Sequence, residues 1–140
     1  MQSFQDLAAS YTKAHDSHDA EAMSQLCSPT CVLVGPVDSI RGREAIKKLL
    51  ERFLAAFGED RFIVNRLLVA DSTLVLEWTF EARHIATYHG PTGDIAATGR
   101  ALKLDGVDVF DVGDGNQIVR YRSYFDHFDL LTQLGAGAVD

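Results

Sequence analysis

Apolar residues recur at steps of three and four along the first part of the chain, and this spacing is typical of amphipathic helices. The clearest run begins near Ser3, and its inner face carries Phe4, Leu7, Ala8, Tyr11, Ala14 and His15. Asp19 is a good N-cap for a short second helix that Pro29 ends, and a third helix ends at Gly58. The pattern therefore predicts helices over residues 3–16, 19–28 and 46–57.

The rest of the chain is dense in β-branched and aromatic residues, and turn residues divide it into separate runs. Asp71-Ser72 and the segment 113–116 predict hairpin turns, and the loop 89–94 joins the middle pair of strands. The predicted strands cover residues 31–34, 62–70, 74–88, 98–112 and 117–126. Helices followed by a strand meander are typical of the α+β class, in which the helices pack on one face of the sheet.

Bulk properties fit a single globular domain over residues 1–140, because this length buries a core yet is short for two domains. No apolar run approaches the roughly 20 residues that span a bilayer, and the first residues lack the features of a signal peptide. We therefore expect a cytoplasmic protein without membrane contact.

The net charge of −7 argues against a nucleic-acid partner. Cys27 and Cys31 have no metal-ligand spacing, so we expect reduced packing residues and no metal site.

Several motifs occur together in a characteristic order. The last strand, residues 118–126, ends in Tyr-Phe-Asp and follows Gly106-Val107-Asp108-Val109-Phe110 and an Asp-Gly turn. With Tyr11, the turn 28–30 and the segment 41–46, this order resembles the SnoaL-like branch of the nuclear transport factor 2-like superfamily. The resemblance implies a cone-shaped α+β roll, in which a curved antiparallel sheet packs on three N-terminal helices around a pocket for a small apolar molecule. Relatives include polyketide cyclases, ketosteroid isomerases, limonene epoxide hydrolases and proteins that only bind or assemble, so the fold leaves the activity open.

Two aspartates are candidate catalytic residues. Asp126 matches the aspartate that similar cyclases and epoxide hydrolases use for proton transfer, and burial in an apolar cavity would raise its pKa into a useful range. Its alternative role is the N-cap of the segment that follows it, and Arg122 would neutralise it if the two side chains met. Asp108 alternates with Leu104 and Phe110. If that face lines the pocket, Asp108 projects inward and pairs with Asp126, and otherwise it faces water.

Tyr11 is the third candidate catalytic residue. It matches the helix tyrosine with which ketosteroid isomerases hold a substrate oxygen, and a buried tyrosine hydroxyl stabilises a developing oxyanion. His15 lies one helical turn later and would sit beside Tyr11. Both residues have a simpler alternative role in the core. The two isomerase acids are replaced by Val34 and Gly106, so we do not expect steroid isomerisation by that arrangement.

The second strand has one polar and one apolar face. Glu81 falls where limonene epoxide hydrolases carry a catalytic aspartate, but Thr79 replaces their arginine, which argues against epoxide opening. The alternative is that Glu81 belongs to a solvated outer face opposite Trp78. The expected substrate contacts are His15, Trp78, Glu81, Phe110 and Tyr124.

Two functions remain open. In the first, Asp126 transfers protons on a small apolar oxygenated compound, as an isomerase, cyclase or hydrolase without an organic cofactor. In the second, the same cavity binds a ligand without reaction, or the domain acts as an assembly module. In both cases the outer face of the sheet is the expected contact of a homodimer, because a large apolar patch is seldom left in water.

Overall fold

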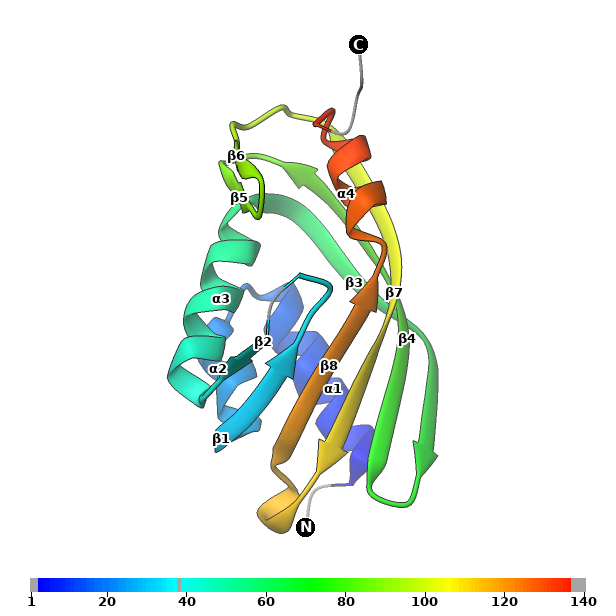
Figure 1. Cartoon of the computed structure of the whole chain (residues 1–140). Coiled ribbons are helices and arrows are strands. Elements are labelled where there is room, and N and C mark those ends of the chain that lie inside the picture. The colour runs from blue at the N-terminus through cyan, green and yellow to red at the C-terminus, as the bar shows by residue number, and fades with distance from the viewer. Residues whose placement is uncertain (1–2, 38, 137–140) are drawn as a thin grey trace.

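A curved sheet wraps around α1, α2 and α3 in this computed structural model, which describes residues 3–37 and 39–136 (Figure 1). The helices are α1 (Phe4–Asp16), α2 (Ala20–Gln25), α3 (Arg43–Ala55) and α4 (His127–Gln133), with a 3-10 turn η1 (Asp114–Asn116). The strands are β1 (Cys27–Val34), β2 (Ser39–Arg41), β3 (Phe57–Ala70), β4 (Thr73–His84), β5 (Tyr88–Gly90), β6 (Gly93–Ile95), β7 (Ala101–Val112) and β8 (Ile118–Phe125). No helix within the described ranges is long and apolar enough to cross a membrane.

The main sheet has the strand order β2-β1-β8-β7-β4-β3, and β5 and β6 form a separate two-stranded ribbon. Three neighbouring pairs are antiparallel, as the hairpin pattern predicted: β3 with β4, β4 with β7, and β7 with β8. β1 instead runs parallel to β8, so the sheet is antiparallel only in part. Alternate residues of β4 and β7 point toward the helices, and Leu74, Phe80, Leu104 and Phe110 form the centre of the core.

Capping residues set the first residues of α1 and α2. Ser3 and Asp6 form a capping box at the start of α1, which buries Leu7 and Tyr11. The Asp19 side chain accepts a hydrogen bond from the Ala22 N–H at 2.9 Å and so caps α2 as predicted.

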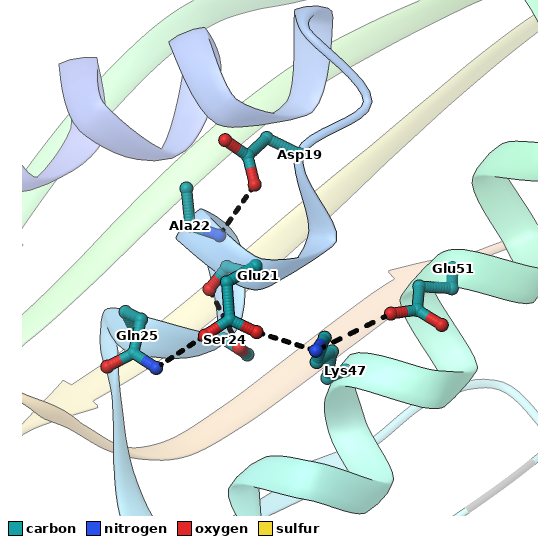
Figure 2. Close-up of polar contacts among 7 residues, drawn as sticks. All are labelled: Asp19, Glu21, Ala22, Ser24, Gln25, Lys47 and Glu51. Atoms are coloured by element: carbon teal, nitrogen blue, oxygen red, sulfur yellow. Dashed lines mark hydrogen bonds and ion pairs between the residues drawn. The ribbon is translucent and has the colours of Figure 1, made fainter.

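A lysine joins the second and third helices. Lys47 of α3 lies 2.7 Å from Glu21 of α2 and 3.9 Å from Glu51 one turn along its own helix (Figure 2). These polar contacts lie beside the packed apolar faces of the two helices. They link α2 to α3 at the surface.

Several boundaries differ from the sequence prediction. β1 begins at Cys27, so Pro29 lies inside a strand and α2 ends at Gln25. The strand tolerates the proline because its register shifts between Cys27 and Val32, and a bulge does not need the missing N–H. The predicted strand 74–88 is divided into β4 and β5, and the predicted loop 89–94 lies within the β5–β6 ribbon. Cys27 and Cys31 are both free and fully buried in the core.

Candidate functional site

A cavity of about 350 Å³ lies between the concave face of the sheet and the helices α1 and α3. Its volume falls in the lower part of the range of small-molecule sites. Aromatic rings form much of its wall, contributed by Phe53, Phe62, Trp78, Phe80, Tyr88 and Phe125. Its polar groups include Tyr11, His15, Asp108, Tyr121 and Ser123, of which all but Ser123 are nearly inaccessible to solvent.

Asp108 is the acidic centre of this polar group. It lies on the inner face of β7, and only 1% of its surface is exposed. The Tyr11 hydroxyl donates a hydrogen bond to Asp108 Oδ2 at 3.0 Å. The Tyr121 hydroxyl contacts the Tyr11 hydroxyl, and since the proton of Tyr11 is committed to Asp108, Tyr121 is the donor of this pair. The three residues thus form a chain of hydrogen bonds that runs from β8 through α1 to β7.

Burial sets the protonation state of each group. Desolvation raises the pKa of Asp108 to about 6, while the Ser123, Trp78 and Tyr11 side chains act in the opposite direction. Burial, followed by the charge of Asp108, raises the pKa of both Tyr11 and Tyr121 well above the ordinary value. Near neutral pH the two tyrosines are therefore protonated donors, and the pKa of Asp108 lies closer to neutrality than that of an ordinary aspartate.

His15 is held neutral beside this chain. Desolvation lowers its pKa to about 4, although the charge of Asp60 raises it in part. The imidazole stacks on Phe62 with ring centroids 4.4 Å apart. It therefore offers a neutral ring to the cavity at physiological pH.

Four of the predicted site residues meet at this cavity: Tyr11, His15, Trp78 and Asp108. The face of β7 that carries Leu104 and Phe110 is the inner one, so Asp108 projects inward with them. Phe110 is fully buried behind the cavity wall, and its ring centroid lies 5.1 Å from that of Tyr11. Phe110 thus supports the tyrosine instead of contacting the cavity.

The predicted position of Asp126 is wrong. Its side chain is exposed, and it accepts a hydrogen bond from the Asp129 N–H at 3.1 Å as the N-cap of α4. Asp108 therefore pairs with Tyr11 and not with Asp126. The predicted neutralising partner also goes elsewhere, because Arg122 lies 3.2 Å from Asp111.

Tyr124 and Glu81 also lie away from the cavity. Ser123 and Phe125 occupy the inward positions of β8, so Tyr124 points outward and is 52% exposed. Glu81 stands opposite Arg61 and Lys103 on the outer face of the sheet. Its predicted substrate contact is therefore wrong, and the solvated-face alternative describes its position.

Sequence reasoning missed several lining residues, among them Tyr121, Ser123, Tyr88 and His127. Tyr121 and Ser123 share the inner parity of β8, but the pattern gave equal weight to the parity of Tyr124. Tyr88 and His127 join the β5–β6 ribbon to α4, since the Tyr88 hydroxyl lies 2.8 Å from His127 Nε2. Figure 1 shows the ribbon and α4 at the same end of the molecule.

Among the described residues, no group of three or more histidine, cysteine or acidic side chains is placed to hold a metal ion.

The family model described as SnoaL-like polyketide cyclase matches residues 5–134 of this chain. Comparison with functionally curated proteins gave no match.

Solved structures with the same fold cover nearly the whole chain. TsrD from Streptomyces laurentii is 23% identical, with 94% of each chain covered and a TM-score of 0.81. A candidate polyketide cyclase from Xanthomonas campestris pv. campestris is 21% identical, with 94% of this chain and 96% of that chain covered and a TM-score of 0.81. A protein of ketosteroid isomerase-like fold from Catenulispora acidiphila, solved in complex with trimethylamine, is 15% identical, with 96% and 98% covered and a TM-score of 0.76. At these identities the likeness shows the fold alone, and it confirms the predicted α+β roll.

Proposed function

The chain belongs to the SnoaL-like polyketide cyclase family, and from this premise we propose that it binds a small apolar oxygenated molecule and moves a proton on it with Asp108 as general acid and base. One observation carries the proposal. Asp108 is buried in an aromatic cavity, has a pKa raised to about 6, and is hydrogen-bonded to Tyr11 at 3.0 Å. A group whose pKa lies near the working pH both accepts and returns a proton efficiently.

The geometry supports a simple sequence of proton movements. Ionised Asp108 takes a proton from a carbon next to a ligand carbonyl, which leaves a neutral carboxylic acid and an enolate. The neutral acid then returns the proton to the ligand at the same or another atom. Tyr11 donates to Asp108 Oδ2 throughout, so the carboxyl group keeps its orientation in both protonation states. The cavity wall is largely aromatic, and surroundings of low polarity strengthen each of these electrostatic interactions.

A second candidate function is binding without reaction. Aromatic rings around a buried carboxylate suit a small ammonium ion, which they hold by cation–π attraction and by the charge of Asp108. The structure of the Catenulispora acidiphila protein in complex with trimethylamine adds to this candidate. The two functions differ in their pH dependence. An amine binds ionised Asp108, so its affinity rises with pH through about 6, whereas a ketone gains a hydrogen bond from the neutral acid below that pH.

The test compares two conservative variants in a screen of cyclic ketones, aromatic polyketones and small amines. Proton exchange into each ketone from deuterated water, followed by NMR, detects catalysis without knowledge of the natural substrate. We expect Asp108→Asn to bind ketones and to lose exchange by roughly 10²- to 10⁴-fold. Asp126→Asn is the matched control and keeps the wild-type rate. Equal exchange in wild type and Asp108→Asn would exclude the catalytic proposal, and binding of amines alone would favour the second candidate.

A further inference from the structure

A short ribbon forms one end of the cavity wall. It consists of β5 and β6, which make a two-stranded sheet of their own, and His89 lies 2.9 Å from Asp94 across it. The first residue of α4, His127, belongs to the same part of the wall. The ribbon residues that line the cavity are Tyr88, His89, Gly90 and Pro91. The ribbon and α4, which lie at the same end of the molecule (Figure 1), thus border one hollow.

Both ends of the ribbon segment are fixed to the body of the domain. Before the ribbon, the Ile85 N–H donates a hydrogen bond to the Ala56 carbonyl at 2.9 Å. After it, the Thr98 N–H donates to Nδ1 of His84, the last residue of β4, at 3.2 Å. Segment 87–97 lies between these two anchors.

A single buried side chain attaches this segment to the domain between its anchors. Of the described residues 87–97, only Tyr88 is buried, at 7% exposure, and the others are half-buried or exposed. Its ring packs against Phe53 of α3 and Phe57 of β3, with centroids 6.3 and 6.1 Å away. Its hydroxyl lies 2.8 Å from Nε2 of His127 on α4. Tyr88 thus connects the segment to three other elements.

A segment that buries so little opens at lower cost than the sheet around it. Segments of this kind swing about a few residues at their ends and control entry to a site. We propose that segment 87–97 is a lid on the cavity, that it swings about its two anchors, and that the hydrogen bond between Tyr88 and His127 is its latch. The lid governs access under either candidate function, because neither the latch nor the anchors include Asp108.

Removal of the latch should raise the population of open lids. A hydrogen bond of ordinary strength shifts such an equilibrium by roughly 2- to 10-fold. Tyr88→Phe removes the hydroxyl and keeps the ring that packs against Phe53 and Phe57. His127→Leu removes the partner and leaves Tyr88 unchanged.

Trp78 reports the opening, because it is the single tryptophan of the chain, lies in the cavity wall and is 5% exposed. Acrylamide, a small neutral quencher, is added to the full chain without any ligand. Lids move far more slowly than fluorescence decays, so the quenched fraction of the emission follows the population of open lids. We expect Tyr88→Phe and His127→Leu each to raise this fraction roughly 2- to 10-fold. Tyr124→Phe removes an exposed hydroxyl from the outer face of the sheet and should leave it unchanged.

The double variant tests whether the two residues act through one bond. If they do, Tyr88→Phe combined with His127→Leu gives a quenched fraction no larger than that of the more strongly affected single variant. Equal fractions in the wild type and in both single variants would overturn the lid. Additive effects in the double variant would overturn the latch. Thermal unfolding monitors the fold, and if Tyr88→Phe does not fold, His127→Leu carries the test, because His127 is only half-buried on α4.

Discussion

Burial distinguishes the two aspartates that the sequence offered as catalytic residues. Asp108 is 1% exposed, and desolvation is the largest cause of its raised pKa. Asp126 is exposed and accepts a hydrogen bond from the backbone at the start of α4. Both residues are aspartates. Asp108 lies on β7, and Asp126 directly follows β8, the other strand of the same hairpin. Only the packing around each of them separates a candidate catalyst from a helix cap.

Replacement of Asp108 by asparagine should stabilise the protein at high pH. The folded-state pKa of about 6 exceeds the ordinary 3.8, so the contribution of Asp108 to stability is fully present below 3.8 and is lost as the pH rises through 6. The asparagine oxygen still accepts from Tyr11. We expect Asp108→Asn to gain up to about 3 kcal/mol at pH 8, and to show no such gain near pH 4. Thermal unfolding from pH 4 to 8 measures this, and a gain independent of pH would contradict it.

His15 should make the protein less stable at acid pH, whereas Asp108 makes it less stable at high pH. Its folded-state pKa of about 4 lies below the ordinary 6.5, so its contribution is fully present above 6.5 and is lost as the pH falls through 4. The charged groups that act on it are Asp60, which raises its pKa, and His18, which lies 2.5 Å from Asp60.

We therefore expect His15→Phe to be relatively more stable at pH 4 than at pH 7 by about 3 kcal/mol. Urea unfolding at both pH values measures the difference. In the wild type the stability contribution of His15 is lost as the pH falls from 6.5 to 4, and that of Asp108 is lost as the pH rises from 3.8 to 6. Over this shared pH range the two changes in stability nearly cancel. An NMR titration in which His15 becomes charged near pH 6.5 would contradict this account.

At the scale of elements, α4 depends on its first turn. Asp126 caps the helix, and Leu130 and Leu134 are buried beneath it. We expect Asp126→Ala to lose about 1 kcal/mol of unfolding free energy, because the cap is removed. Asp126→Asn should be close to wild type, because asparagine caps equally well. Urea unfolding measures both variants, and an equal loss in the two would show that the charge matters more than the cap.

The strands show how far periodicity predicts the site. In β7 the apolar residues Leu104 and Phe110 share one parity, so the sequence correctly linked Asp108 to them. In β8 both parities carry aromatic residues, with Tyr121 on one and Tyr124 on the other. Alternation alone does not decide between such faces. The resemblance, and not the alternation, placed Asp126 in the cavity, and that position is wrong.

Other features depended on contacts that are distant in sequence. The parallel pairing of β1 with β8 joins residues more than eighty positions apart, as in Leu33 with Tyr121. The bulge that admits Pro29 also arises from that pairing. The hydrogen bond between Tyr11 and Asp108 spans 97 positions and follows from the fold instead of from local spacing. The sequence thus predicted most elements and four members of the site, but not the bonds among them.

At the scale of the whole molecule, the outer face of the sheet is a candidate contact for a second copy of the chain. Some of its charged groups are paired within the chain, as in Arg66 with Glu77 at 2.7 Å and Arg122 with Asp111 at 3.2 Å. Exposed apolar side chains remain on it, including Leu68 at 43% and Tyr124 at 52%.

We therefore expect a homodimer that buries this face and separates when Tyr124 is replaced by glutamate, because the substitution places two like charges near a two-fold axis. Phe128→Glu is the matched control, since Phe128 is 68% exposed on α4 and lies outside the sheet. Sedimentation velocity at micromolar concentration measures the mass of each variant. The cavity lies on the concave side of the sheet, so the Tyr124→Glu monomer should bind a cyclic ketone from the same screen as the wild type does. A monomeric wild type would contradict the dimer, and a ligand affinity that falls with dissociation would show that assembly shapes the cavity.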